Sequence, residues 1–132
     1  MMQRVLILVL ALAAGPLADA QHFAAALAPC SSGPGNEVRA LHADSLSSSF
    51  LICVLNEVRP HYHALHTEHV VVIDGEAEML LGDSLFRIGP GDVIAIPRGT
   101  VHAVTTRSER PLRVASIQSP RFDGTDRVPV ER

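Results

Sequence analysis

The chain has 132 residues, of which 47% are hydrophobic and 4% aromatic, and its formal net charge is −3. This length supports one domain. The slightly acidic balance excludes a broadly basic nucleic-acid-binding protein, so we expect no nucleic-acid partner. All eleven cationic side chains are arginine, which excludes a lysine Schiff base and a P-loop lysine.

Residues 1–20 have the pattern of a signal peptide. Arg4 gives a positive start, residues 5–14 form an uninterrupted apolar run, and Ala18-Asp19-Ala20 reads as a cleavage site. A membrane-spanning helix needs about 20 apolar residues, which is twice the length of this run. We therefore expect a secreted or periplasmic protein with no stable membrane insertion after cleavage.

The two cysteines of the chain have two interpretations. An oxidising compartment permits a disulfide between Cys30 and Cys53, which would stabilise the fold by roughly 3 kcal/mol on the chain-entropy model. Alternatively, Cys53 is a small buried hydrophobe within the apolar run 50–55. No CxxC motif occurs, so thiol redox chemistry is poorly supported.

Downstream of a predicted N-terminal arm at 21–39, the chain is a series of short β-type runs divided by turn residues. Asp74-Gly75 is a strong hairpin signal, and no stretch of a dozen residues has helical periodicity. The pattern predicts an all-β fold, a small antiparallel sandwich or barrel over about 40–118, with 119–132 as a tail on its surface. The predicted strands are 49–58, 69–73, 76–81, 84–88, 92–96, 101–106 and 112–118.

The histidines carry the chemistry. His61 and His63 are two residues apart, so on a strand both imidazoles project from one face. Glu68 can join them from the neighbouring strand if the chain bends through 64–67, and His102 follows the turn at 97–99. Three neutral imidazoles and one carboxylate suit a divalent ion such as iron, manganese, nickel, copper or zinc, and leave coordination positions open.

A histidine pair on a strand is often only a polar pair on a half-exposed face, and Glu68 alone would be an exposed acid in most proteins. Here all four residues have inward parity beside apolar partners. Buried polar groups of this kind need a hydrogen bond or a metal. The combination therefore favours a metal site over four unrelated polar side chains.

The same residues resemble the two conserved motifs of the cupin superfamily. The first motif is His61-x-His63, four residues, Glu68, six residues and Gly75. The second motif is Gly91, five residues, Pro97-x-Gly99, two residues and His102. The resemblance covers residues 61–106.

This resemblance implies a double-stranded β-helix, or jelly roll, with metal ligands at His61, His63, Glu68 and His102. Leu55 stands where the first motif usually opens with glycine, and Thr106 where the second usually closes with asparagine. Neither position is a metal ligand, so the fold and the metal are little affected.

Other inward positions offer substrate contacts. His66 is expected near the mouth of the site, and Arg98 either binds an anionic substrate or is simply solvated. His69 has outward parity and is expected on the surface. The inward positions Val70, Val72, Met79, Leu81 and Ile94 are apolar. We take His66, Arg98 and Met79 as candidate substrate contacts and expect a small or apolar substrate.

The resemblance implies a metal-dependent enzyme that acts on a small oxygenated molecule, similar to small cupin dioxygenases, with cupin isomerases and lyases close behind. No side chain can be assigned as general base, so the catalytic residues stay open. The alternative is a non-catalytic module that binds a metal or a small ligand such as a sugar. Polar groups that converge inside the barrel would favour the enzyme. Outward Val71, Ile73 and Leu85 suggest a homodimer.

Overall fold

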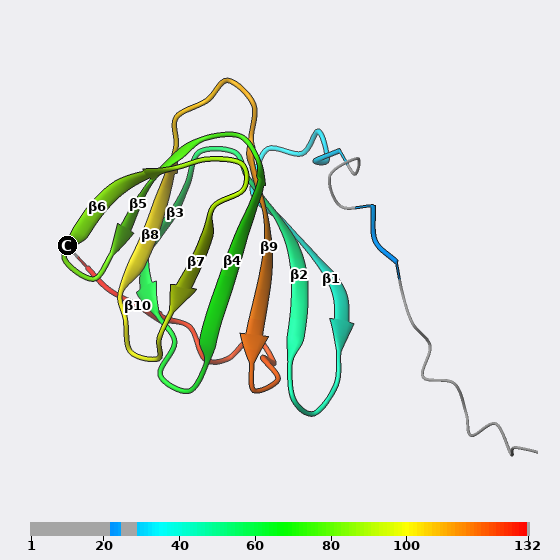
Figure 1. Cartoon of the computed structure of the whole chain (residues 1–132), viewed down its shortest axis with the longest axis vertical. Helices are drawn as coiled ribbons and strands as arrows, with labels where there is room; N and C mark the ends of the chain where they lie inside the picture. The colour runs from blue at the N-terminus through cyan, green and yellow to red at the C-terminus, as the bar shows by residue number, and fades with distance from the viewer. Residues whose placement is uncertain (1–21, 25–28, 132) are drawn as a thin grey trace, which may run out of the picture.

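The computed structural model describes residues 22–24 and 29–131, so the predicted signal peptide lies outside the described residues. Within the described residues, ten antiparallel strands form two sheets of five, and no helix occurs, hence none that could cross a membrane. The two sheets lie face to face (Figure 1). The predicted all-β jelly roll is confirmed.

The strands alternate between the two sheets as the chain proceeds. Only β1–β2 and β5–β6 are neighbours both in the chain and within one sheet. One sheet has the order β1 (Glu37–Ala43), β2 (Ser48–Val54), β9 (Leu112–Ser119), β4 (Thr67–Asp74) and β7 (Val93–Ile96). The other has the order β10 (Val128–Pro129), β3 (Glu57–Tyr62), β8 (His102–Thr106), β5 (Ala77–Leu81) and β6 (Ser84–Ile88).

This topology differs from the sequence-based expectation at Asp74-Gly75. The pair makes a tight turn, with Gly75 at a φ of 78°, but β4 and β5 lie in different sheets. The turn is therefore a crossover between sheets and no hairpin. Turn residues report how sharply the backbone reverses, whereas the partner strand is set by which sheet buries the next apolar face.

The predicted strand 49–58 is two strands, β2 and β3, with a turn at Leu55 and Asn56. Asn36 stabilises this turn from outside, because its side-chain oxygen accepts a hydrogen bond from Leu55 N (2.9 Å) and its amide donates to Glu57 O (2.7 Å). Because this turn contains neither glycine nor proline, the sequence showed no break within 49–58 and predicted a single strand. The domain also extends past 40–118 at both ends, since β1 begins at Glu37 and β10, which pairs with β3, lies at Val128–Pro129.

The core lies between the sheets, where alternate residues of each strand point inward. In β9, Leu112, Val114, Ser116 and Gln118 are buried and the residues between them are half-buried. Each large aliphatic side chain removed from water stabilises the fold by about 1.5–3 kcal/mol. The buried apolar cluster comprises Val54, Val72, Ala77, Met79, Ile88, Ile94, Ile96, Leu112 and Val114.

Cys30 and Cys53 form a disulfide that ties the segment before β1 to β2. Cys53 is also 3% exposed, so it contributes to the interior as well. The two interpretations of this cysteine are therefore compatible.

Gly75→Ala should destabilise the fold by about 3 kcal/mol, combining the cost of a left-handed alanine with a backbone clash. An added Cβ would lie 2.5 Å from Pro111 O and 2.8 Å from Leu112 Cα. The matched control is Gly82→Ala, which has a φ of 58° but open space around the Cβ, and which should lose only about 1 kcal/mol. Equal losses for the two variants in chemical denaturation would contradict this prediction.

Candidate metal centre

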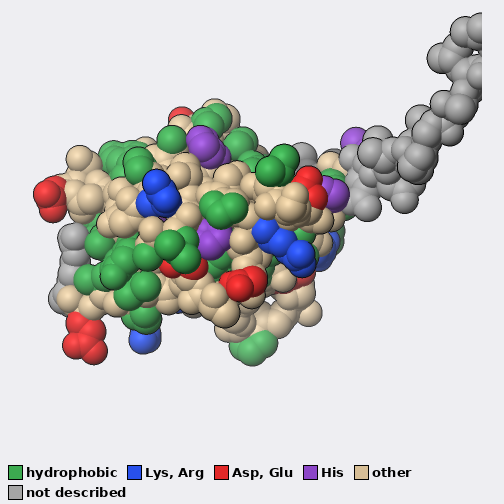
Figure 2. Space-filling view, turned by 90° about the horizontal axis from the view of Figure 1, so that it is seen from below, with side chains coloured by type: hydrophobic (Ala, Val, Ile, Leu, Met, Phe, Trp, Pro, Cys, Tyr) green, Lys and Arg blue, Asp and Glu red, His purple; other side chains and the backbone are tan. Residues whose placement is uncertain are grey.

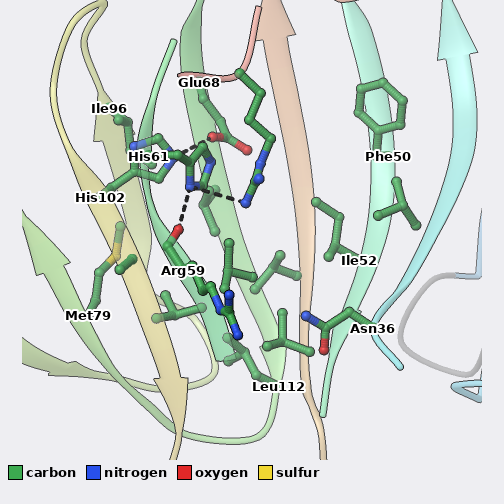
Figure 3. A pocket seen from close by; sticks show the side chains of 18 of the residues that line it. Asn36, Phe50, Ile52, Arg59, His61, Glu68, Met79, Ile96, His102 and Leu112 are labelled. Atoms are coloured by element: carbon green, nitrogen blue, oxygen red, sulfur yellow. Dashed lines mark hydrogen bonds and ion pairs between the residues drawn. The ribbon is translucent and has the colours of Figure 1, made fainter. Parts of the chain in front are cut away.

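Three imidazoles meet at one end of the space between the sheets. His61 on β3 pairs in register with His102 on β8, and His63 directly follows β3. The ligand nitrogens of the three lie within 4.8 Å of one another, and each residue is 4–6% exposed. The three predicted histidines thus form one buried cluster; Figure 3 shows His61 and His102 of this cluster together with Glu68.

Glu68 completes the cluster from the opposite sheet. Its Oε2 atom lies 3.4 Å from His63 Nε2 and 3.3 Å from His102 Nε2. The chain does bend through 64–66, as expected, but β4 belongs to the sheet that faces β3, so Glu68 does not come from a neighbouring strand. The four side chains therefore span the gap between the two layers.

Ser116 on β9 fixes the other carboxylate oxygen, because its hydroxyl donates a 2.5 Å hydrogen bond to Glu68 Oε1. Burial by itself would raise the pKa of Glu68, but hydrogen bonds from His102, His63 and Ser116 outweigh burial and hold this pKa well below its ordinary value. Glu68 is therefore an anion at neutral pH, as a metal ligand must be.

The Nδ1 atoms of all three imidazoles face backbone carbonyls. His61 Nδ1 donates to Arg59 O (2.8 Å), His102 Nδ1 donates to Thr100 O (3.0 Å), and His63 Nδ1 donates to Asp126 O. In a neutral imidazole these partners select the tautomer whose Nε2 carries a lone pair, the form that binds a metal, whereas an Nε2 that carries a proton donates it to Glu68. Hydrogen bonds of this kind orient metal-bound histidines in many proteins.

The donor set fits a divalent cation. In this tautomer the Nε2 lone pairs of His63 and His102 face Glu68 Oε2, and acceptors at this distance need a proton or a cation between them. Burial and the nearby His102 lower the pKa of His61 to about 4, which keeps this imidazole neutral at pH 7. Burial opposes protonation of His63, but Glu68 and the Asp126 carbonyl raise its pKa above the ordinary value.

The C-terminal segment, residues 119–131, makes hydrogen bonds to residues of this site, in addition to covering the surface. The Asp126 carboxylate accepts hydrogen bonds from Ala64 N and Leu65 N (both 2.8 Å) and from His66 Nδ1 (2.5 Å). The same residue supplies the carbonyl for His63. One aspartate thus fixes the bend that carries the chain from His63 to Glu68.

His66 is buried between this segment and the bend. Its Nε2 donates to Arg121 O (3.0 Å), and its ring contacts Phe122 with a centroid distance of 5.2 Å. His66 does not line the cavity, so the structure does not place it at the mouth as a substrate contact.

A cavity of about 460 Å³ extends from the histidines between the sheets to Asn36 and Glu57. Met79 lines it, in agreement with its predicted inward position, whereas Arg98 is exposed and does not line it. Arg98 lies in the turn after β7, where the inward–outward alternation that buries Ile96 no longer applies, and its side chain is exposed. Of the two interpretations of Arg98, the structure agrees with a solvated side chain and not with a substrate contact. His69 is exposed, as expected.

Sequence reasoning missed four residues of the site: Ser116, Gln118, Asp126 and Arg127. The first two had a signal, since they continue the inward parity of Leu112 in a predicted strand, where a polar residue is unusual. Asp126 and Arg127 had no such signal in the sequence, because their role depends on where the C-terminal segment docks.

Figure 2 shows the molecule from below relative to Figure 1, and hydrophobic, charged and histidine side chains are interspersed on this face.

The metal-free protein should lose stability as the pH falls from 6.5 toward 4. In this range the unfolded chain protonates His61, whereas the folded site, where the pKa of His61 is about 4, keeps it neutral. His63 acts in the opposite sense and at higher pH, because its pKa is raised in the folded state: its contribution is complete below pH 6.5 and is lost as the pH rises above 6.5. His61→Gln should therefore reduce the loss of stability between pH 6.5 and 4, and His63→Gln should reduce the loss as the pH rises above 6.5, both measured by urea unfolding; a pH dependence unchanged in both variants would contradict the assignment.

Asp126→Ala should weaken metal binding by about 10–100-fold, the usual effect of losing a group that supports the ligands. The measurement is competition against a chromophoric chelator. Asp123→Asn is the matched control, because Asp123 lies on the same segment and bonds only to its neighbour Thr125 among the described contacts. Equal affinities for the two variants would show that the segment does not hold the site.

Comparison with known proteins agrees with this geometry. Residues 55–118, which contain all four candidate ligands, match the family model of the cupin domain (Cupin_2). A protein of Aquifex aeolicus (strain VF5), described only as uncharacterized, is 37% identical over 95 residues, which cover 72% of this chain and 78% of that protein.

Two solved structures extend the comparison. An uncharacterized conserved protein with a double-stranded β-helix domain from Klebsiella pneumoniae has a TM-score of 0.72 at 19% identity, over 86% of this chain and 100% of that chain. Pac13 of Streptomyces, a nucleoside dehydratase, has in a structure with uridine a TM-score of 0.65 at 15% identity, over 74% and 79% of the two chains. At these identities the structures establish the shared fold. Its two-sheet jelly roll and its matching domain thus make this chain a small single-domain member of the cupin superfamily.

Proposed function

We propose that this protein is a metal-dependent enzyme that binds one divalent ion through His61, His63, Glu68 and His102 and acts on a small oxygenated molecule in the cavity. The observation that carries the proposal is the buried cluster in which histidine Nε2 atoms and Glu68 Oε2 face one another beside an open cavity. When bound, the ion would supply Lewis acidity and, if redox-active, chemistry with dioxygen.

The protein contributes a shaped and largely apolar environment. Aliphatic side chains from both sheets make up most of the cavity lining, and a less polar lining strengthens electrostatic interactions beside it. Polar groups also converge there, since Gln118 and Arg127 line the cavity beside the histidines. Polar groups that converge inside the barrel favour an enzyme over a non-catalytic binding module.

The dioxygenase-like reaction remains our first hypothesis. A lyase is the second reaction type, and Pac13 supports it as a dehydratase on a similar fold. A non-catalytic binding module also has an observation in its favour. The two carboxylates that line the cavity are Glu68, which we assign as a ligand, and Glu57, which is exposed and pairs with Arg59, so neither is available as a general base beside the ligands.

We propose further that the chain is exported and that residues 1–20 are removed. The disulfide between Cys30 and Cys53 supports this location, because disulfides persist mainly in oxidising compartments. The homodimer also remains a proposal; of the residues that suggested it, Leu85 on β6 is 63% exposed, whereas Val71 and Ile73 on β4 are half-buried.

Elemental analysis of the purified protein should find about one divalent ion per chain, the stoichiometry of a single tetrahedral or octahedral site. His63→Ala and His102→Ala should each lose most of this metal, because each removes one of four ligands. His69→Ala is the matched control, since His69 lies on β4 beside Glu68 but is exposed. Metal content that is unchanged in all three variants would remove the site.

The same preparations separate the enzyme from the binding module. Iron-, manganese- and zinc-loaded protein would be incubated with small oxygenated molecules in ¹⁸O₂-saturated buffer and followed by mass spectrometry. A dioxygenase incorporates ¹⁸O only with a redox-active ion, whereas a lyase eliminates water with any of the ions. Stoichiometric binding of a molecule without its conversion would favour the binding module.

A further inference from the structure

The cavity contains a buried hydrogen-bonding group that the metal site does not use. Gln118 on β9 is 5% exposed, and its Oε1 atom has no hydrogen-bond partner among the described residues. Gln118 pairs in register with Glu68, so the amide lies on the same inward face as the ligand carboxylate. Because buried polar groups are nearly always paired, this amide requires a partner that occupies the cavity.

Arg127 adds an unneutralised cation close by. Its Nη2 atom lies 3.4 Å from His61 Nδ1, which already donates its proton to Arg59 O. Within the described part of the chain, no carboxylate forms an ion pair with Arg127. Arg127 is itself an exposed residue, but it lines the cavity beside the candidate ligands, so its guanidinium has donors for an acceptor that enters the cavity.

The charges around the cavity add to a positive total. Arg59 and Glu57 offset each other, with 3.4 Å between Arg59 Nε and Glu57 Oε1. A divalent ion bound by Glu68, its single anionic ligand, would leave a net charge of +1 at the metal site. The guanidinium of Arg127 adds a second positive charge. Excess positive charge at an apolar cavity favours an anion.

The rest of the lining defines the body of the ligand. Between the histidines and Asn36, the cavity wall is aliphatic and aromatic and includes Ile52, Val58, Val70, Met79, Leu112 and Phe122. Such a wall provides few hydrogen bonds for a sugar, whose hydroxyl groups would lose their water without replacement. An apolar body fits this surface.

We propose that the cavity binds a small carboxylic acid with an apolar body and a hydroxyl group, the carboxylate facing Arg127 and the hydroxyl facing Gln118. Arginine presents paired donors to a carboxylate, and a hydroxyl can both donate and accept, so it serves either end of the amide. This inference rests on the proposed function, because it names the substrate class of the same site.

The test uses three probes of similar size: salicylate, the neutral 2-hydroxybenzyl alcohol, and benzoate, which lacks the hydroxyl. Each is titrated by calorimetry into zinc-loaded protein and into protein treated with EDTA, and metal content is measured before and after. Salicylate should bind zinc-loaded protein about tenfold more tightly than the alcohol, the effect of one charge-assisted hydrogen bond.

Variants identify the groups responsible. Arg127→Gln should remove most of the preference for salicylate over the alcohol in both forms of the protein, and Arg127→Lys should retain part of it. Gln118→Leu should reduce the preference for salicylate over benzoate. Arg98→Gln is the matched control, because Arg98 is exposed and outside the cavity, and it should leave both preferences unchanged.

Equal affinities for salicylate and the alcohol, a preference that survives Arg127→Gln, or no measurable binding of salicylate to either form would overturn the inference. Its failure is distinguishable from failure of the proposed function. Protein that holds stoichiometric zinc but shows no preference retains the metal site and refutes the substrate class. Protein that takes up no zinc on loading but keeps an Arg127-dependent preference for salicylate supports the substrate class and refutes the metal site.

Discussion

The structure depends on keeping one carboxylate and three imidazoles out of water at the end of an aliphatic interior. Burial opposes the charge on Glu68, so this residue stays ionised only because the two histidines and Ser116 surround it with hydrogen bonds. Because the partners come from both sheets, the cluster forms only when the two layers pack together. Assembly of the fold and assembly of the site are therefore the same event.

The three histidines are not held in the same way. His61 and His102 each donate to the carbonyl two residues earlier in the chain, at Arg59 and Thr100, so their orientation is set by residues close to them in sequence. His63 lies beyond the end of β3 and takes its carbonyl from Asp126, a residue 63 positions away. Two ligands are thus oriented locally, and the third depends on the docking of the C-terminal segment.

This difference explains how much of the site could be predicted from the sequence. Strand parity and the turns around 64–67 and 97–99 were sufficient to predict that His61, His63, Glu68 and His102 lie close together, because those signals are local. The sheet from which Glu68 comes was not predictable, since parity along one strand does not say which strand it faces. Asp126 could not be found either, because its neighbours in sequence carry no pattern that predicts where the segment docks.

The fold was predictable in class for the same reason, and its errors have physical causes. The run 49–58 hid a turn because the group that stabilises the turn, the amide of Asn36, lies in a distant segment. Thr106, which departs from the cupin motif, still contributes to the fold, since its hydroxyl donates to Val54 O (3.0 Å) across the two sheets. In both cases a side chain acts on a backbone group that is remote in sequence.

Two adjacent residues of the C-terminal segment connect the candidate metal site with the proposed anion site. Asp126 holds the bend next to His63, while Arg127 reaches into the cavity beside His61. Displacing the segment would remove a carbonyl from one candidate ligand and the cation from the cavity together. By thermodynamic linkage, a ligand that binds Arg127 favours the docked segment, and the docked segment favours the orientation of His63 that a metal requires. Under the proposed function, metal affinity and anion affinity would therefore be coupled through Asp126 and Arg127, the two residues that precede β10.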